Sequence, residues 1–220
     1  MFPNGYSNLP SGKLATWNAG DCCAKARDNN IDDVGFFRQM VTNITAQMNI
    51  DRDKIYATGM SNDGMMSERL ACEMADVFKA IASVAGPDGT KSCKPARPIS
   101  VLQIHAFDDD HVLFNGGAGQ NSFHNISTVT DFTSIPETVS RWVKRNNCQT
   151  KPQHVLKVDG AYCDLYAPCD GGAEVKLCVT ETSGPSWPGG EKPGGIKKKS
   201  PTSKAISAND EMWKFFEGLE

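Results

Sequence analysis

The sequence has few histidines, few aromatic residues and no long apolar run. Its 220 residues include four histidines and 8% aromatic side chains, and the formal net charge is −3. Nucleic-acid binding usually shows as a surplus of basic residues, and the composition has none. A membrane-spanning helix needs roughly 20 consecutive apolar residues, and no stretch reaches that length. We therefore expect neither a nucleic-acid partner nor insertion into a membrane.

Cysteine, in contrast, is abundant. The eight cysteines are an even number at a density typical of secreted, disulfide-bonded proteins. Zinc ligands usually come in pairs two to four residues apart, whereas Cys22 and Cys23 are adjacent and Cys163 and Cys169 have no histidine close by. We expect an extracellular protein with disulfides, whose pairing the spacing leaves open, and with no metal and no cofactor.

The order of apolar patterns predicts one α/β domain over residues 1–220. Short apolar runs indicate strands, and apolar residues at three- and four-residue steps indicate helices. Strands that alternate with helices favour a mostly parallel sheet, with the functional groups at its carboxyl edge. The predicted strands lie at 54–59, 78–85, 99–104, 154–158 and 174–179, and the predicted helices at 31–44, 63–74, 136–145 and 208–218.

The segment 54–66 is the most informative part of the chain, because a strand passes through Gly-x-Ser into a helix. A nucleophile elbow has this outline, with its serine on a strained strand-to-helix turn. Ser61 is therefore the candidate nucleophile, and the backbone N–H of Asn62 is the candidate oxyanion donor. Asp63 stands where the usual elbow has a glycine, and its bulk and charge would weaken oxyanion stabilisation.

A candidate acid follows the strand at 99–104. A catalytic serine needs a base, and the base needs an acid that fixes its tautomer. Asp109 lies in an acidic run at the predicted carboxyl edge of the sheet. Carboxylates also suit calcium. Three consecutive side chains cannot all face one ion, however, so a solvated loop with one triad-like member is the preferred interpretation.

These segments together resemble the secreted polyhydroxybutyrate depolymerase and feruloyl esterase family of α/β-hydrolases. The resemblance extends over nearly the whole chain. It implies an α/β-hydrolase-like fold and a serine esterase acting on polymeric or aromatic esters, with Ser61 as nucleophile and Asp109 as triad acid. The segments that carry it are WNAGDCC at 17–23, DDVGF at 32–36, YATGMSN at 56–62, IH at 104–105 and SWPGG at 186–190.

The general base departs from the family pattern. Family members carry the catalytic histidine two residues before the tryptophan of Trp-Pro-Gly-Gly, and Pro185 occupies that place. Loss of a triad base typically costs several orders of magnitude in rate. His111, close to the acid loop, and His124, in a Gly/Asn/Ser-rich insertion, are the candidate replacement bases. His105 is interpreted as structural and His154 as a surface residue.

The amino-terminal region departs as well. The family has further strands and a His-Gly-Gly-type loop before the matched region, and residues 1–5 enter a turn with no export signal ahead of it. The sequence thus predicts a fold truncated at the amino terminus, from a processed chain or one that begins inside a longer protein. The strand at 54–59 would become a sheet edge, which favours homodimerisation or a rearranged covering loop.

Trp17 and Trp187 are the candidate substrate-binding residues. Their rings suit an apolar cleft for an aromatic or polymeric acyl chain, although a loop tryptophan packed on a disulfide fits the sequence equally well. Two functions therefore stay open. The first is a serine carboxylesterase with an atypical triad, and the alternative is a non-catalytic member of the fold that binds a polymer or carbohydrate through these tryptophans.

Overall fold

The protein folds around a six-stranded mixed sheet. The computed structural model describes residues 1–122, 131–191 and 202–219. In spatial order the strands are β1 (Tyr56–Met60), β2 (Ala80–Val84), β3 (Ser100–Ala106), β6 (Val175–Thr180), β5 (Ala161–Tyr166) and β4 (Gln153–Val158). The first four run parallel, whereas β5 is antiparallel to both of its neighbours. This confirms the predicted α/β class with a mostly parallel sheet.

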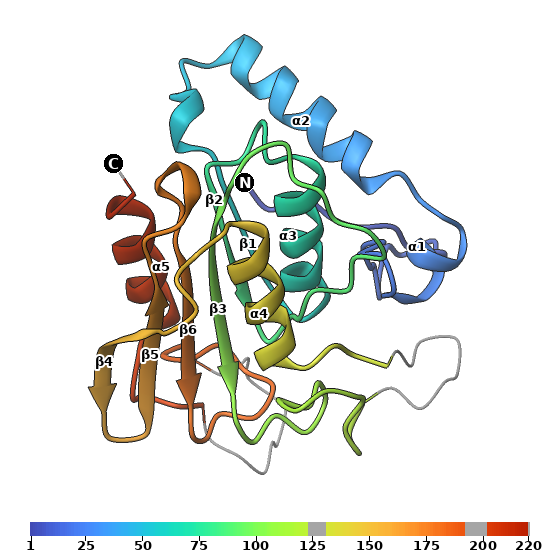
Figure 1. Ribbon diagram of the computed structural model, residues 1–220. Coiled ribbons are helices and arrows are strands. Elements are labelled where there is room, and N and C mark those ends of the chain that lie inside the picture. The colour runs from blue at the N-terminus through green and yellow to red at the C-terminus, as the bar shows by residue number, and fades with distance from the viewer. Residues whose placement is uncertain (123–130, 192–201, 220) are drawn as a thin grey trace.

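Helices cover both faces of the sheet (Figure 1). On one face α3 (Asn62–Glu73) packs on β1 and β2, and α4 (Ile135–Arg145) packs on β3 and β6; α5 (Ala208–Glu217) packs on β2 and β3 from the other. Successive strand side chains point to opposite faces. Accordingly, Ile81 of β2 belongs to the core beneath α3 and α4, and its neighbours in the strand belong to the core beneath α5.

The helix predicted at 31–44 forms, but it lies on the surface. It is α2 (Asp33–Gln47), and the Asp32 carboxylate caps it by accepting from the N–H of Gly35. Phe37 is the one apolar side chain of α2 that is buried, while Val34 and Val41 are only partly covered. A shorter helix, α1 (Ala24–Asp28), precedes it. The apolar spacing thus predicts the helix correctly, while most of its apolar side chains are only partly covered.

Strand β5 is missing from the predicted elements. Asp159 and Gly160 join β4 to β5 as a two-residue hairpin loop, in which Gly160 has φ +77°. An Asp-Gly pair between two apolar runs is a strong hairpin signal. Polar and apolar residues are mixed in β5, and Asp164 is only half-buried, so an apolar run does not mark this strand in the sequence.

All eight cysteines are paired, which confirms the predicted disulfides. Three bridges join separate segments. One ties the end of α3 to the loop after β2, one ties the segment after α4 to the segment after β5, and one joins the neighbouring strands β5 and β6. The paired cysteines are 21, 21 and 15 residues apart, and closing such loops stabilises the fold mainly by restricting the unfolded chain. The pairs are Cys72–Cys93, Cys148–Cys169, Cys163–Cys178 and the adjacent Cys22–Cys23.

Strand β1 is an edge of the sheet. Within the ranges that the structure describes it pairs with β2 alone, as the sequence predicts for this strand. In the same ranges, no helix is both long enough and apolar enough to cross a membrane. The short 3-10 turns at Arg52–Lys54 and Asp170–Gly172 complete the regular structure.

Candidate active site

The candidate catalytic residues share the carboxyl edge of the parallel strands. Ser61 follows β1, Asp109 lies three residues beyond β3, and Trp187 lies in the loop after β6. Backbone hydrogen bonds lock the strand ends together: the N–H of Ser61 donates to the carbonyl of Val84 (2.8 Å), and that of Phe107 donates to the carbonyl of Thr180 (2.8 Å). The topology therefore places Ser61 and Asp109, the candidate nucleophile and acid, at the same edge of the sheet.

Ser61 occupies a strained turn between β1 and α3. Its φ of 57° and ψ of −121° lie in a region that residues other than glycine rarely adopt, and such strain costs about 1–3 kcal/mol. The turn fits because its neighbours are small. A Cβ on Gly59 would collide with the Cβ of Asp63, and a Cβ on Gly86 would lie 2.6 Å from the Ser61 carbonyl oxygen. The Ser61 residue is exposed, as a nucleophile elbow requires.

Asn62 and Asp63 tie the elbow to Trp17. The Asn62 amide accepts from the Trp17 N–H (2.7 Å) and donates to the Trp17 carbonyl (3.0 Å), and the Asp63 carboxylate accepts from the indole N–H (2.8 Å). Partial removal from water raises the pKa of Asp63, and the indole bond opposes this rise. First-turn backbone N–H groups have no partner within a helix, so the Asn62 N–H is free of the α3 hydrogen-bond ladder.

Asp109 is buried and held by its own loop. One carboxylate oxygen accepts from the N–H groups of His111 (2.9 Å) and Val112 (3.0 Å). The other oxygen has no hydrogen-bond partner and lies 3.5 Å from Nε2 of His105. Burial lowers the pKa of His105, and its Nε2 lies 2.9 Å from the Val112 carbonyl, which can only accept. His105 is therefore neutral with its proton on Nε2, the structural role that the sequence predicts.

None of the described histidines contacts the nucleophile. His111 pairs through Nδ1 with Asp110 (2.7 Å) rather than with Asp109, so its placement as a relocated triad base finds no contact here. His154 pairs with Asp164 on the β4–β5 hairpin. His124 lies outside the described residues. Pro185 lies in the loop after β6, where the resemblance implies the base.

The two candidate binding tryptophans differ in their surroundings. Trp17 is 5% exposed and packs against Phe36 and Phe37, with ring centroids 6.0 and 4.9 Å away. Trp17 as a cleft residue therefore stays a prediction, and its contacts to the elbow leave little of its surface exposed. Trp187 is partly exposed and donates from its indole N–H to Asn209 (3.0 Å) at the start of α5.

The acid loop also carries a group of ligand-type atoms. One atom each from Asp109, Asp110 and His111 lies within 4.8 Å of the others. Asp110 is already paired with His111 and with the Asn121 amide, and a histidine does not suit calcium. The arrangement therefore adds no support for the calcium alternative considered above.

A hollow lies beside the first turns of α3. It is shallow and is lined by apolar groups of Met65, Pro87 and Phe132, together with Asp88 and Asp131. Met65 is one helical turn beyond Ser61. The hollow therefore lies between α3 and the loop after β2, and Ser61 is not among the residues that line it.

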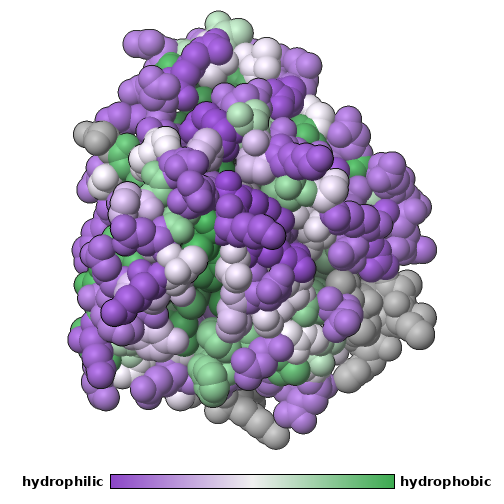
Figure 2. Space-filling model, viewed as in Figure 1, coloured by the Kyte–Doolittle hydropathy of each residue, from purple (hydrophilic) through white to green (hydrophobic). Residues whose placement is uncertain are grey.

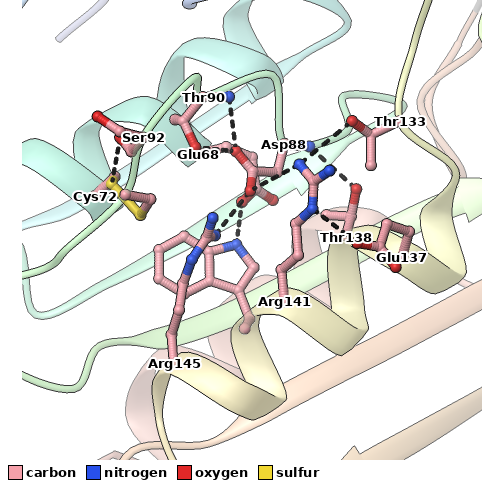
Figure 3. A network of polar contacts seen from close by, with 12 residues as sticks. Glu68, Cys72, Asp88, Thr90, Ser92, Thr133, Glu137, Thr138, Arg141 and Arg145 are labelled. Atoms are coloured by element: carbon pink, nitrogen blue, oxygen red, sulfur yellow. Dashed lines mark hydrogen bonds and ion pairs between the residues drawn. A yellow bond between two sulfur atoms is a disulfide. The ribbon is translucent and has the colours of Figure 1, made fainter.

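Sequence reasoning misses a buried charged network beneath this hollow (Figure 3). The fully buried Asp88 pairs with Arg145 (2.7 Å) and more loosely with Arg141 (3.7 Å). Its carboxylate also accepts from the backbone N–H and hydroxyl of Thr90, and its own N–H donates to the hydroxyl of Thr138. The network joins the loop after β2 to α4.

Glu68 extends this network under the elbow helix. It is wholly buried and accepts from the indole N–H of Trp142. With its amide nitrogen turned toward them, Gln103 donates to Glu68 (3.1 Å) and to the carbonyl of Gly86 (3.2 Å). A glutamate among the apolar residues of the predicted helix at 63–74 is the one signal that the sequence offers. Gly86 in turn packs on the Ser61 carbonyl, so the network supports the elbow from below.

Glu68 makes the stability of the fold depend on pH. Burial, with a smaller contribution from the Asp88 charge, raises the pKa of Glu68 from 4.5 to about 8. Between these values the folded chain keeps a proton that the unfolded chain has lost, so the free energy of unfolding falls as pH rises. We expect Glu68→Gln to raise Tm at pH 8 by on the order of 5 °C, and to change it little near pH 4.5. Thermal melts across this range measure the difference.

The matched control is Glu217→Gln, which changes an exposed glutamate of α5. Its melting curves should follow those of the unmodified chain at every pH. A Glu68→Gln effect equal at pH 4.5 and pH 8 would show that Glu68 is not the group that titrates.

Comparison with known proteins shows similarity of the chain to proteins named as esterases. It is 36% identical to Feruloyl esterase B of Piromyces equi over 174 residues, which cover 76% of this chain and 30% of that protein. It is 29% identical to Probable feruloyl esterase C of Aspergillus clavatus (70% and 54% covered) and 24% identical to the Bifunctional acetylxylan esterase/xylanase XynS20E of Neocallimastix patriciarum (66% and 20%). No family model matches. The chain thus spans little more than half, or less, of these relatives. It is related in sequence to the feruloyl esterases.

Proposed function

We propose that the chain is a carboxylic ester hydrolase with Ser61 as its nucleophile. The observation that carries the proposal is the strained conformation of Ser61 at the turn from β1 to α3, because strain of this kind persists where function requires it. The esterase relatives support the same reaction class. The polyhydroxybutyrate depolymerase part of the sequence resemblance has no counterpart among them, so polyester cleavage is the less supported substrate choice.

The reaction follows from the positions of these groups. A base takes the proton of the Ser61 hydroxyl, and the serine oxygen attacks the ester carbonyl carbon. The carbonyl oxygen becomes negatively charged, and the Asn62 N–H donates a hydrogen bond to it. Loss of the alcohol leaves an acyl-serine, and water then releases the acid and restores the hydroxyl. The Asp109 carboxylate orients the base and fixes its tautomer. His111 and His124 are the candidate bases, and a base outside the usual place implies slow turnover.

The surface near the acid loop supports an ester with an apolar part. Apolar side chains gather at the lower rim of the face shown in Figure 2, below the carboxyl end of β3. The loop that follows β3 carries Phe107, which is 61% exposed, and Leu113. We propose aromatic or acyl esters of plant cell-wall polymers as substrates and, given the disulfides, an extracellular place of action. Trp187 is the remaining candidate for contact with the polymer.

The first test is hydrolysis of p-nitrophenyl acetate and methyl ferulate by the purified chain, measured against buffer. Release above the buffer rate supports the esterase. The alternative function, polymer binding without catalysis, is favoured by Pro185. It predicts no release, together with retention of the chain on insoluble arabinoxylan.

We also propose that the β1 edge mediates homodimerisation. A strand edge presents unpaired backbone groups that can pair with a second chain. We expect light scattering to report twice the chain mass, and Thr58→Pro, which puts a proline into β1, to shift it toward the single-chain mass. A single-chain mass for the unmodified protein at all concentrations would remove this proposal.

A further inference from the structure

The loops after β3 and β6 begin side by side. Ala106 pairs in register with Thr180, and the Phe107 N–H donates to the Thr180 carbonyl. The loop after β3 carries Asp108 and Asp109, and the loop after β6 carries position 185. The two loops therefore start together, and Asp108 joins them by side-chain hydrogen bonds.

Asp108 holds the second loop through its backbone. One oxygen of its carboxylate accepts from the N–H groups of Ser183 (3.0 Å) and Gly184 (2.9 Å). Two consecutive N–H groups that converge on one anion form a nest, and Gly184, with φ +55°, supplies the left-handed residue that this geometry uses. Hydrogen bonds to a charged acceptor are roughly twice as strong as neutral ones.

Hydrogen bonds within the loop at 183–186 fix its conformation on both sides of residue 185. The Ser186 hydroxyl lies 2.7 Å from both the hydroxyl and the carbonyl of Ser183, and the Ser186 N–H donates to the Gly184 carbonyl (2.8 Å). Residue 185 therefore sits in a short turn with little freedom of its own. The anchorage of Ser183 and Gly184 sets its position relative to the acid loop.

Asp108 and Asp109 have different tasks. Asp109 is fixed by the N–H groups of its own loop and keeps one buried oxygen without a hydrogen-bond partner. We propose that Asp108 is a positioning residue: it clamps the loop at 183–186 to the acid loop and so fixes the position of residue 185 relative to Asp109. The proposal rests on the proposed function, because it assigns these two loops to the catalytic machinery.

An imidazole introduced at position 185 is the probe. In Pro185→His, NMR titration should give this imidazole a pKa above its value in the Pro185→His, Asp109→Asn double variant, because the Asp109 carboxylate favours the charged ring. Adding Asp108→Ala to Pro185→His should remove at least half of that elevation. Adding Asp108→Asn should keep most of it, since an amide oxygen can still accept both N–H bonds.

Asp110→Ala is the matched control for loss of a nearby charge, because Asp110 pairs with His111 and Asn121 instead. It should lower the pKa of the imidazole less than Asp108→Ala does. Equal effects of Asp108→Ala and Asp110→Ala, or no dependence on Asp109, overturn the proposal.

A second measurement needs neither titration nor turnover. In a chain that keeps Pro185, Asp108→Ala should speed amide hydrogen exchange at Ser183 and Gly184 by at least about tenfold. Exchange at the amides of the strands should be unchanged. Unchanged exchange at both amides overturns the clamp. Because neither readout uses an ester, failure of the clamp and failure of the esterase proposal are separate results.

Discussion

Ser61→Ala is expected to slow strongly the hydrolysis of p-nitrophenyl acetate that the chain causes. The variant lacks the atom that attacks the carbonyl, while the Asn62 N–H and the surrounding surface remain. Because binding and oxyanion stabilisation without a nucleophile still give some acceleration, the rate should fall by at least ~100-fold rather than to nothing. Initial rates at several substrate concentrations measure this.

The control for this substitution is Ser140→Ala, on the exposed side of α4. It should leave the rate unchanged. A Ser61→Ala variant with full activity would assign the hydrolysis to another group and move the chain toward the binding alternative. If Ser61 is required, His111→Ala and His124→Ala in the same assay identify which imidazole serves as base, since only loss of the true base should match Ser61→Ala.

Pro185→His is expected to raise esterase activity by about 100-fold or more. Proline carries no group that accepts a proton, and a positioned general base contributes roughly 10²–10⁴ in rate. The Asp109 oxygen without a hydrogen-bond partner is buried beside Nε2 of His105, and the gain requires that the introduced imidazole reaches this carboxylate. The gain should rise with pH as the imidazole loses its proton, near an ordinary value of about 6.5 or above it. A pH–rate profile of kcat/KM records both.

Two comparisons decide whether the gain has this origin. Pro185→Gln removes the ring without adding a base, and it should stay at the level of the original chain. Pro185→His combined with Asp109→Asn should lose most of the gain, because the imidazole then lacks the carboxylate that orients it. A gain of the same size in Pro185→Gln would mean that the proline restricts the loop and that no base is involved.

The strongly patterned elements could be predicted, and the side-chain contacts could not. β1, the elbow and α3 follow from a local pattern, and so does the shared edge that brings Ser61 and Asp109 together. Glu68 shows the limit. Its burial depends on Trp142, which is 74 residues away in the sequence, and no local pattern reports that contact.

The burial of α2 and the contacts that hold Trp17 and the loop after β6 could not be predicted, for the same reason. The apolar stripe of α2 indicated a helix but not which face a neighbour covers, and Trp17 looked like a ligand-binding aromatic because the amide of Asn62, which fixes it, is 45 residues away. The Asp108 clamp depends on a contact across 75 residues. Such contacts depend on the strand order, which the spacing of the strands along the chain does not specify.

The buried proton on Glu68 gives the molecule a working range of pH. An imidazole base works better as the solution becomes more alkaline, until its own proton is gone. Over the same interval the helix that carries Ser61 becomes costlier to keep in place, because the carboxylate beneath it, with a pKa of about 8, is increasingly forced to ionise. Raising the pH therefore increases the catalytic rate and lowers the stability of the fold. The activity of Pro185→His should be highest at a pH between the pKa of its imidazole base and that of Glu68.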